Sequence, residues 1–462
     1  MNIAILGFGR EGQSTLKFLK KSSLYKNARI SILDKKTDKS YLKKLSNFDL
    51  VFRTPGIPYN LPEIQKAVKN GVKFSSATQL FFEQLRGQTQ TKRGITRKNI
   101  KIIGITGTKG KGTTSTLLYK ILKACGKPRS RASSLRGRNV LLAGNIGKSP
   151  LELIPKLKKN SIVILELSSF QLQDLKTSPD IAVVLNIFPD HMDSHKNFSE
   201  YLNAKASIAK FQKKSDKFFY DATNKYSKLI SKKSKGKKIP VQYNDIASRK
   251  FLNYPACDVK HLIGMPGEHN LKNAAMAAAI ALSLGCPKEK VAKIIKNFKG
   301  NEHRLELTRT IRINQLYPHK SASISFYNDS ASTNPQTTIA AINAFKEPKI
   351  VIMGGKDKEL DYEPLAKTIK KSNTKLIILF GENKNKIAKA ISGIKNNELR
   401  IMEVKNLNSA VNLAYKTAKS LINQFPNFPI IILFSPAAAS FDMFKDYADR
   451  GKKFKELVKK LK

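Results

Sequence analysis

The chain has 462 residues, 41% of them hydrophobic, a length that predicts two to four domains because one core rarely serves more than about 300 residues. No apolar run reaches the roughly 20 residues of a membrane-spanning helix, and the first residues do not resemble a signal peptide. Three widely spaced cysteines predict neither disulfides nor a zinc site. We therefore expect a cytoplasmic protein. The formal net charge of +51 would suit a nucleic-acid binder, but the basic residues are spread evenly, which favours a lysine-rich surface over a specific nucleic-acid site.

The first expected segment, residues 1–98, opens with a strand and a glycine-rich turn. An apolar run over 2–6 is followed by Gly7-Phe8-Gly9-Arg10-Glu11-Gly12, and the next apolar run ends at Asp34. Glycines between a strand and a helix let a pyrophosphate approach the backbone, and an acid after the next strand can bind a ribose hydroxyl. The spacing predicts a dinucleotide or UDP diphosphate site, with helix packing as the alternative reason for the glycines.

The second expected segment, residues 99–300, opens with the most informative stretch of the chain. An apolar strand is followed by Gly107-Thr108-Lys109-Gly110-Lys111-Gly112-Thr113-Thr114 and then by a helical stretch. Such a turn lets backbone N–H groups surround phosphates, while Lys111 supplies a cation and Thr113 or Thr114 a hydroxyl for Mg²⁺. The loop departs from the usual G-x-x-x-x-G-K-[ST] because Gly112 follows the lysine. We predict ATP and Mg²⁺ binding; a loop that only caps the helix is the alternative.

Side chains further along could complete this site. Glu166 closes an apolar strand, where a carboxylate near a phosphate loop is a natural Mg²⁺ ligand. Ser168, which follows it, could equally cap a helix. His191 and His195 stand four apart, as helical zinc ligands do, but no third soft ligand is near. One histidine with Glu166 around Mg²⁺ is the better interpretation.

Polar residues on both sides of the second boundary could bind a nucleoside. Asn270 and Asn273 are three apart, where amides can bind an adenine edge or cap a helix. Arg304 could bind a nucleotide and Asp329 a ribose, but neither assignment stands alone. The stretches around these two residues, 303–306 and 328–335, are too polar for core strands.

Apolar strands alternate with helical stretches along the whole chain, which predicts an α/β fold with mainly parallel, doubly wound sheets. We expect three domains, at 1–98, 99–300 and 301–462. The expected core strands are 2–6, 30–33, 49–52, 102–105, 162–167, 181–187, 350–353, 376–380 and 430–434.

In this order, the motifs resemble those of the ATP-dependent Mur ligases over nearly the whole chain. The D-glutamate-adding branch is favoured by N-D-S-x-x-T-N at 328–334 and by S-P-A-x-A-S at 435–440. The resemblance implies a Rossmann-like UDP-binding domain, a P-loop-like ATPase domain and a Rossmann-like C-terminal domain, in a cytoplasmic monomer. It also implies that D-glutamate is joined to UDP-N-acetylmuramoyl-L-alanine, through an acyl phosphate, in peptidoglycan precursor synthesis. Further likeness lies in the loop at 107–114 and at 166–172, 186–193, 267–273 and 303–306.

The resemblance alone assigns roles to matching positions. It implies that Lys111, His191 and Lys205 are catalytic, and the family carbamylates the matching lysine. The nucleotide-sugar would be bound by Gly9, Asp34, Thr54, Gly56, Asn145 and Ser168. ATP would be bound by the loop from Gly107 to Thr114 and by Asn270, Asn273, Arg304 and Asp329. Mg²⁺ would be bound by Thr113, Glu166, His191 and carbamylated Lys205, and D-glutamate by Thr333, Lys358, Ser440 and the Tyr447 backbone.

Three departures from the family pattern bear on these roles. Ala331 replaces the lysine usual in N-D-S-K-A-T-N, and Lys356 or Lys358 could compensate for the lost charge. Gly112 interrupts the lysine–hydroxyl pair, as related folylpolyglutamate synthetases tolerate, and the basic segment 128–138 has no clear counterpart. A sibling ligase or a folylpolyglutamate synthetase is the first alternative, although the latter lacks a UDP-binding domain. A non-enzymatic nucleic-acid binder is the second.

Overall fold

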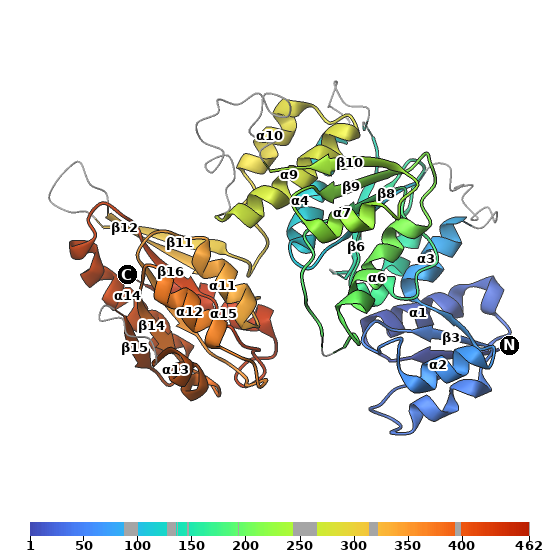
Figure 1. The fold of residues 1–462 in the computed structure, drawn as a ribbon, viewed down its shortest axis with the longest axis horizontal. Helices are drawn as coiled ribbons and strands as arrows, with labels where there is room; N and C mark the ends of the chain where they lie inside the picture. The colour runs from blue at the N-terminus through green and yellow to red at the C-terminus, as the bar shows by residue number, and fades with distance from the viewer. Residues whose placement is uncertain are drawn as a thin grey trace. The chain divides into compact units, whose positions relative to one another are not determined.

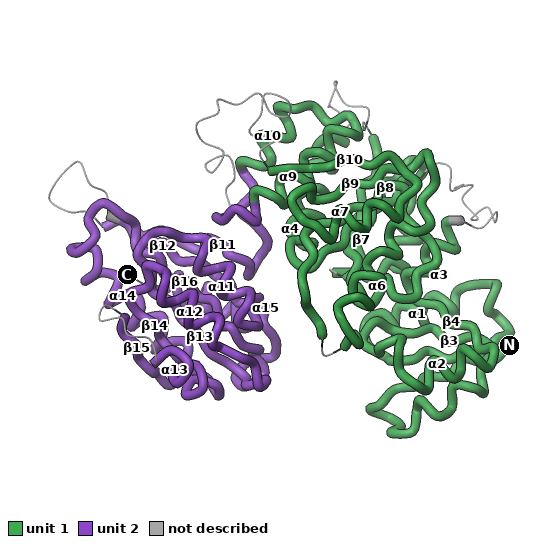
Figure 2. The backbone as a smooth tube through the Cα atoms, in the orientation of Figure 1, with its two compact units in different colours: residues 1–259, 271–296 green, residues 260–270, 297–462 purple. Residues whose placement is uncertain are grey.

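A computed structural model describes residues 1–86, 100–126, 135, 137–145, 147–192, 194–243, 266–313, 322–392 and 399–461. Strands and helices alternate along the chain (Figure 1). They form two compact units, one of residues 1–259 and 271–296 and one of residues 260–270 and 297–462 (Figure 2). The expected linker at 88–99, most of the segment 128–138, Cys257 and Asp193 lie outside the described residues.

The first unit begins with a four-stranded parallel sheet of order β2-β1-β3-β4. Ile3 and Ile5 pack in one core cluster and Ala4 and Leu6 in another, because alternate side chains of a strand face opposite sides of the sheet. The elements are β1 (Asn2–Leu6), α1 (Arg10–Lys21), η1 (Ser23–Tyr25), β2 (Arg29–Leu33), η2 (Tyr41–Asn47), β3 (Leu50–Arg53), α2 (Pro62–Lys69), β4 (Lys73–Ser75) and α3 (Ala77–Arg86).

The second sheet of this unit has six parallel strands in the order β10-β9-β8-β5-β7-β6. Its strands are β5 (Lys101–Thr106), β6 (Val140–Gly144), β7 (Ile162–Glu166), β8 (Ile181–Val184), β9 (Lys217–Asp221) and β10 (Lys237–Val241). Its helices are α4 (Lys111–Cys125), η4 (Pro150–Lys156), α5 (Ser169–Leu172), α6 (Phe198–Lys210), α7 (Lys225–Ser231), α9 (Glu268–Ser283) and α10 (Lys288–Lys296).

The basic run at 232–238, whose composition suggests a solvated loop, is irregular up to residue 236, but Lys237 and Lys238 open β10, an edge strand where exposed lysines and a proline are tolerated. Cys125 and Cys286 are free cysteines; both are buried, and their thiols are hydrogen-bonded to each other.

The second unit holds a six-stranded sheet of order β11-β12-β16-β13-β14-β15, in which only the pair β11–β12 is antiparallel. Its strands are β11 (Glu306–Ile313), β12 (Ala322–Asn328), β13 (Lys349–Met353), β14 (Thr374–Leu379), β15 (Arg400–Glu403) and β16 (Ile430–Phe434). Its helices are α11 (Pro335–Asn343), α12 (Glu363–Lys371), α13 (Lys384–Ser392), α14 (Leu407–Gln424) and α15 (Tyr447–Lys460).

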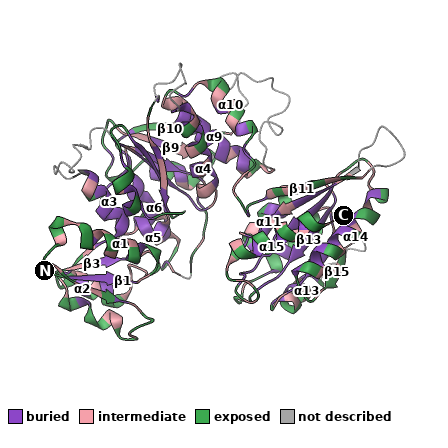
Figure 3. Cartoon of the chain, turned by 180° about the vertical axis from the view of Figure 1, so that it is seen from behind, coloured by how far each residue is buried: buried purple, intermediate pink, exposed green. Residues whose placement is uncertain are grey.

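Buried residues follow the central strands of each sheet, and β13 and β16 are buried along their whole length (Figure 3). The stretches at 303–306 and 328–335, expected to be too polar for core strands, each contain one strand residue at their edge, because β11 begins at Glu306 and β12 ends at Asn328. Three mainly parallel sheets confirm the predicted α/β fold class, while the three domain boundaries stay a prediction. Across the described ranges, no helix is long and apolar enough to cross a membrane.

Candidate active site

The glycine-rich loop after β5 is held in place by the end of β8 and by α9. Thr108 N donates to Asn186 O at 2.8 Å, and Lys109 N donates to Asn186 Oδ1 at 3.3 Å. Gly110 has φ +86°, and a Cβ there would collide with Asn273 Oδ1, which accepts from Thr114 Oγ1 at 3.3 Å. Glycine is therefore required at position 110 for both conformation and space, and Asn273 lies directly against the loop.

The helix that follows, α4, begins at Lys111 without a cap. Gly110 supplies no side-chain acceptor, and the first turn holds no acid. The first N–H groups of α4 therefore lack intrahelical acceptors, and the helix dipole adds partial positive charge. Lys111 Nζ donates to the carbonyls of Gly107 and Thr108, both at 3.0 Å. This combination of amides and ammonium is the arrangement that binds phosphate at helix N-termini.

Glu166 lies at the carboxyl end of β7, next to β5. Its Oε1 accepts from Asn145 Nδ2 at 2.9 Å, while its Oε2 is buried and has no hydrogen-bond partner in the described structure. A buried carboxylate oxygen without a donor is costly unless a cation reaches it. Thr113, in the first turn of α4, is also buried. Ser168 caps α5, because its Oγ accepts from Gln171 N at 3.2 Å.

Two histidines after β8 contact one phenylalanine of α5. His195 is buried, stacks on Phe170 at 5.1 Å between ring centroids, and has Nε2 3.1 Å from Ser169 Oγ. His191 is half exposed, has φ +59° and meets the Phe170 ring edge-on at 5.3 Å. Burial lowers the pKa of both histidines, which favours the neutral imidazole. Neither histidine lies on a helix, so the spacing of helical zinc ligands does not apply to them. The described ranges hold no group of three His, Cys, Asp or Glu side chains suited to a metal ion.

Lys205 of α6 is buried beneath the loop. Its Nζ donates to Gly107 O at 2.9 Å and lies 4.6 Å from the centroid of the Tyr201 ring, one helical turn earlier. Burial, with the nearby charge of Lys111, lowers the pKa of Lys205 well below its usual value. Lys205 is therefore shifted toward an uncharged amine, in contact with the loop that the sequence assigns to ATP.

The N-terminal glycine turn packs against the turn that follows β3. Gly7 has φ +88°, and a Cβ there would collide with Thr54 Oγ1, while a Cβ at Gly12 would collide with Gly7 O. A Cβ at Gly9 or Gly56 would meet no atom within 4 Å. Packing explains two of the four glycines, and open space next to the other two suits a close ligand approach.

Asp34 holds the backbone of the same turn. Its Oδ2 accepts from Phe8 N at 2.7 Å and its Oδ1 from Lys36 N at 2.9 Å. These backbone hydrogen bonds lower the pKa of Asp34. The predicted ribose-binding acid is thus ionised and fixed beside the glycine turn.

Several predicted residues of the second unit follow the carboxyl ends of β12, β16 and β13, which are neighbours in the sheet. Asp329 accepts from Leu305 N at 3.1 Å and from Ser435 Oγ at 2.8 Å, and burial raises its pKa to about 6. Tyr447, the first residue of α15, accepts from Ser330 Oγ at 2.8 Å through its carbonyl. The other predicted residues of this unit are Asn270, whose Nδ2 donates to Pro266 O, and Arg304, Thr333, Lys358 and Ser440.

The two lysines that could compensate for Ala331 have different surroundings in the structure. Lys356 Nζ is paired with Glu382, with 2.6 and 2.9 Å to its two oxygens. Lys358 is exposed, and its Nζ lies 5.9 Å from the centroid of the Phe441 ring. Since Lys356 is already neutralised by a carboxylate, Lys358 is the better candidate.

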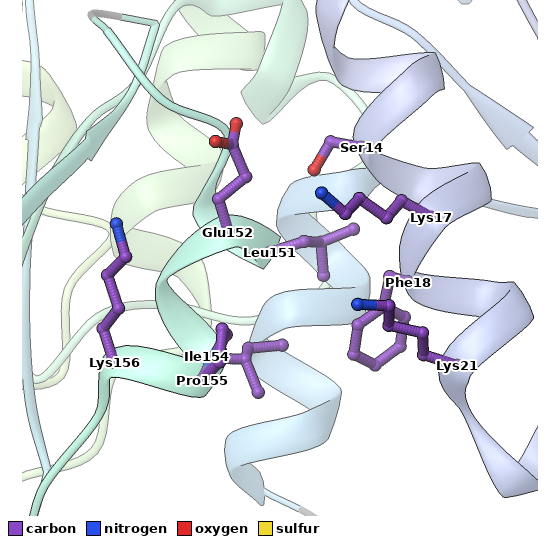
Figure 4. Close-up of a pocket in the computed structure, with 9 residues that line it drawn as sticks. All are labelled: Ser14, Lys17, Phe18, Lys21, Leu151, Glu152, Ile154, Pro155 and Lys156. Carbon is purple, nitrogen blue, oxygen red and sulfur yellow. The ribbon is translucent and has the colours of Figure 1, made fainter.

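A separate hollow of about 490 Å³ lies between α1 and η4 (Figure 4). Phe18, Ile154 and Pro155 form part of its apolar lining, and Lys17 and Lys21 stand at its edge. None of the predicted site residues lines it, so it has no part in the candidate site.

Comparisons with known proteins show the family of this chain. Residues 105–281 match the family description "Mur ligase middle domain", and residues 303–422 match "Mur ligase, glutamate ligase domain". A UDP-N-acetylmuramoylalanine--D-glutamate ligase from Clostridium tetani is 32% identical over 491 residues, covering 99% of this chain and 96% of its own. The chain belongs to the Mur ligase family. The enzyme of the same name from Acetivibrio thermocellus is 33% identical over 90% of this chain and 84% of its own.

Solved structures of Mur ligases share this fold. The MurF ligase from Thermotoga maritima, solved in complex with ADP, matches with a TM-score of 0.53 and 15% identity, covering 99% of this chain and 95% of that one. At this identity the likeness shows the fold alone, a Mur ligase fold built on mainly parallel sheets.

Several contacts of the candidate site were not predicted from the sequence. Tyr201 OH lies 2.8 Å from Thr108 Oγ1, and Lys109 Nζ lies 3.1 Å from Asp190 Oδ2. Tyr201 stands four residues before Lys205 on one helix face, a spacing that could have indicated their contact. No local pattern predicts the Lys109–Asp190 pair, because it joins loops after two different strands.

Proposed function

We propose that this Mur ligase uses ATP to join D-glutamate to UDP-N-acetylmuramoyl-L-alanine, a cytoplasmic step of peptidoglycan precursor synthesis. The start of α4 is the observation that carries the proposal. This helix begins at Lys111 without a side-chain cap, directly after a loop in which a Cβ at Gly110 would collide with Asn273. Amides at the start of a helix, a lysine and a tight glycine turn favour the binding of a nucleoside triphosphate. The names of the curated relatives supply the two other substrates.

The residues present suit Mg²⁺. Glu166 offers a buried oxygen without a donor, Thr113 a hydroxyl, and His191 a neutral imidazole. Mg²⁺ prefers oxygen ligands and is commonly held by few protein groups together with phosphate oxygens. When bound, it would neutralise phosphate charge and orient the terminal phosphate.

The reaction must replace a poor leaving group before an amide can form. The carboxylate of the muramoyl-alanine substrate attacks the terminal phosphorus of ATP, which gives an acyl phosphate and ADP. The amine of D-glutamate then attacks the acyl carbon, and phosphate leaves. Lys111 and the α4 amides reduce the repulsion between carboxylate and phosphate, which is the main catalytic contribution in phosphoryl transfer.

Lys205 suits carbamylation. Its uncharged amine can attack CO₂, forming an N–C bond and releasing a proton, and the product is an anion. The lowered pKa of Lys205 favours the uncharged amine that this reaction requires. The anion would form beside Gly107 O, at the loop.

Substrate contacts follow the edges of the sheets. The nucleotide-sugar would lie at the open space before Gly9 and Gly56, with Asp34, Thr54, Asn145 and Ser168. Adenosine would be bound by Asn270, Asn273, Arg304 and Asp329, and D-glutamate by Thr333, Lys358, Ser440 and the Tyr447 backbone. Ligands of doubly wound sheets lie at the carboxyl ends of strands, which supports these assignments. We also propose that the chain has three domains, at 1–98, 99–300 and 301–462, and that it is a monomer. Light scattering of the pure protein tests the monomeric state through the molar mass.

The test is phosphate release with UDP-N-acetylmuramoyl-L-alanine, ATP and a panel of amino acids. Of the amino acids in the panel, only D-glutamate should support turnover. Lys111→Ala should lower kcat by several orders of magnitude, because it removes a charge that stabilises the phosphate in the transition state. Turnover with another amino acid would favour a sibling ligase, and with a folate a folylpolyglutamate synthetase. Near-normal turnover by Lys111→Ala would contradict the assignment of the loop.

A further inference from the structure

A buried arginine links the two sheets of the first unit. Arg53, the last residue of β3, is 1% exposed, and its Nε donates to Asp174 Oδ2 at 2.9 Å, where the Asp174 side chain is 3% exposed. Asp174 follows α5, next to the second sheet, whereas Arg53 belongs to the first. A buried arginine needs most of its five N–H groups satisfied.

The remaining donors of Arg53 hold backbone carbonyls on both sides. Nη1 donates to Ile57 O at 2.6 Å and to Thr54 O at 3.4 Å, the two ends of the turn that contains Gly56. Nη2 donates to Phe170 O at 2.8 Å. A planar fork can hold three carbonyls in fixed relation, which a lysine ammonium on a flexible stem does far less well.

Both groups of carbonyls lie next to proposed site residues. Thr54 packs on Gly7, so the clamped turn is part of the proposed nucleotide-sugar site. Phe170 contacts His191, a proposed catalytic residue, by its ring. Arg53 therefore stands between the turn that would bind the acceptor and the segment that lies at the phosphate loop.

We propose that Arg53, anchored by Asp174, is a positioning residue that fixes the 54–57 turn relative to Phe170 and so sets where the acceptor carboxylate meets ATP. This inference rests on the proposed function. A misplacement of about 1 Å between reacting groups lowers rates by roughly 100-fold. Loss of the clamp should therefore act on the nucleotide-sugar and leave ATP binding at the separate loop intact.

The experiment compares Arg53→Lys, Arg53→Met and the double variant Arg53→Met/Asp174→Leu with the wild type. Removing one partner of a buried ion pair destabilises a protein, whereas replacing both with apolar side chains is often neutral. The double variant should thus recover part of the melting temperature that Arg53→Met loses. Its kcat/KM for the nucleotide-sugar should stay lowered by roughly 10- to 100-fold, with the KM for ATP changed less than about threefold, because the carbonyl contacts stay lost.

A core variant, Ile230→Ala, is the control for stability, since Ile230 is buried in α7, a helix that packs on β9 and α6, and makes none of the hydrogen bonds of Arg53. It should lower the melting temperature and leave kcat/KM for the nucleotide-sugar and KM for ATP unchanged. A double variant whose kcat/KM for the nucleotide-sugar returns to the wild-type value together with its stability would show that Arg53 is only structural and would overturn the inference. Absence of ligase turnover in the wild type would instead reject the proposed function.

Discussion

Lys349 gives a stability prediction with a worked magnitude. It opens β13, between β16 and β14, is fully buried, and its Nζ has no hydrogen-bond partner among the described residues. Burial is the main cause that lowers the pKa of Lys349 from 10.5 to about 8; Glu347 opposes this effect and Lys375 adds to it. Each pKa unit between folded and unfolded states corresponds to about 1.36 kcal/mol, so protonated Lys349 costs the folded state roughly 3 kcal/mol.

The sign follows from the lowered pKa of a base. The cost is fully present below pH 8, falls as the pH rises from 8 to 10.5, and vanishes above 10.5, where the amine is neutral in both states. Lys349→Met, of similar length and without a polar atom, should raise the free energy of unfolding by about 2–3 kcal/mol at pH 7. The melting temperature should rise by roughly 5–10 °C.

The assay is thermal and denaturant unfolding of wild type and variant between pH 6.5 and about 10.5. Lys370→Met, which removes an exposed lysine of α12, is the control and should change stability by less than about 0.5 kcal/mol. A variant that is less stable than the wild type at pH 7, or whose advantage stays constant to pH 10.5, would refute the reasoning.

Three further predictions concern the candidate site. Gly110→Ala should lower ATP affinity by at least about tenfold, since its Cβ would collide with Asn273; calorimetry measures this, with exposed Gly71→Ala as control, and unchanged affinity would contradict it. Lys205→Ala should lose activity that added short carboxylates partly restore, and full activity without rescue would remove the carbamate from the account. Ala331→Lys should alter the KM for D-glutamate more than that for ATP, and equal changes in both would place position 331 away from the amino acid.

The parallel sheets could be predicted because most of their strands are apolar runs bounded by turn-forming or polar residues. The runs at 102–105 and 162–167 became β5 and β7, and Glu166 ends β7 as expected. Strands with mixed polarity were missed. β11 alternates between exposed and half-buried residues, so its antiparallel pairing with β12 leaves no continuous apolar run in the sequence.

Contacts between residues that are distant in the chain could not be predicted, because they leave no local pattern. The glycines and lysines at 107–114 indicate a phosphate-binding loop, but the collision that a Cβ at Gly110 would make with Asn273 depends on α9, which lies over 150 residues later. The His191–His195 spacing suggested a helix, whereas the left-handed conformation of His191 belongs to a turn. Spacing identifies candidates, and only tertiary packing decides which of them lie together.

The most direct test of the central claim is ATP consumption by the pure protein with UDP-N-acetylmuramoyl-L-alanine and D-glutamate, each omitted in turn. The account predicts ADP and phosphate release that requires both, with one amide formed per ATP. If folded protein that binds ATP consumes none with both substrates present, the assignment of the phosphate loop to ligase chemistry is contradicted.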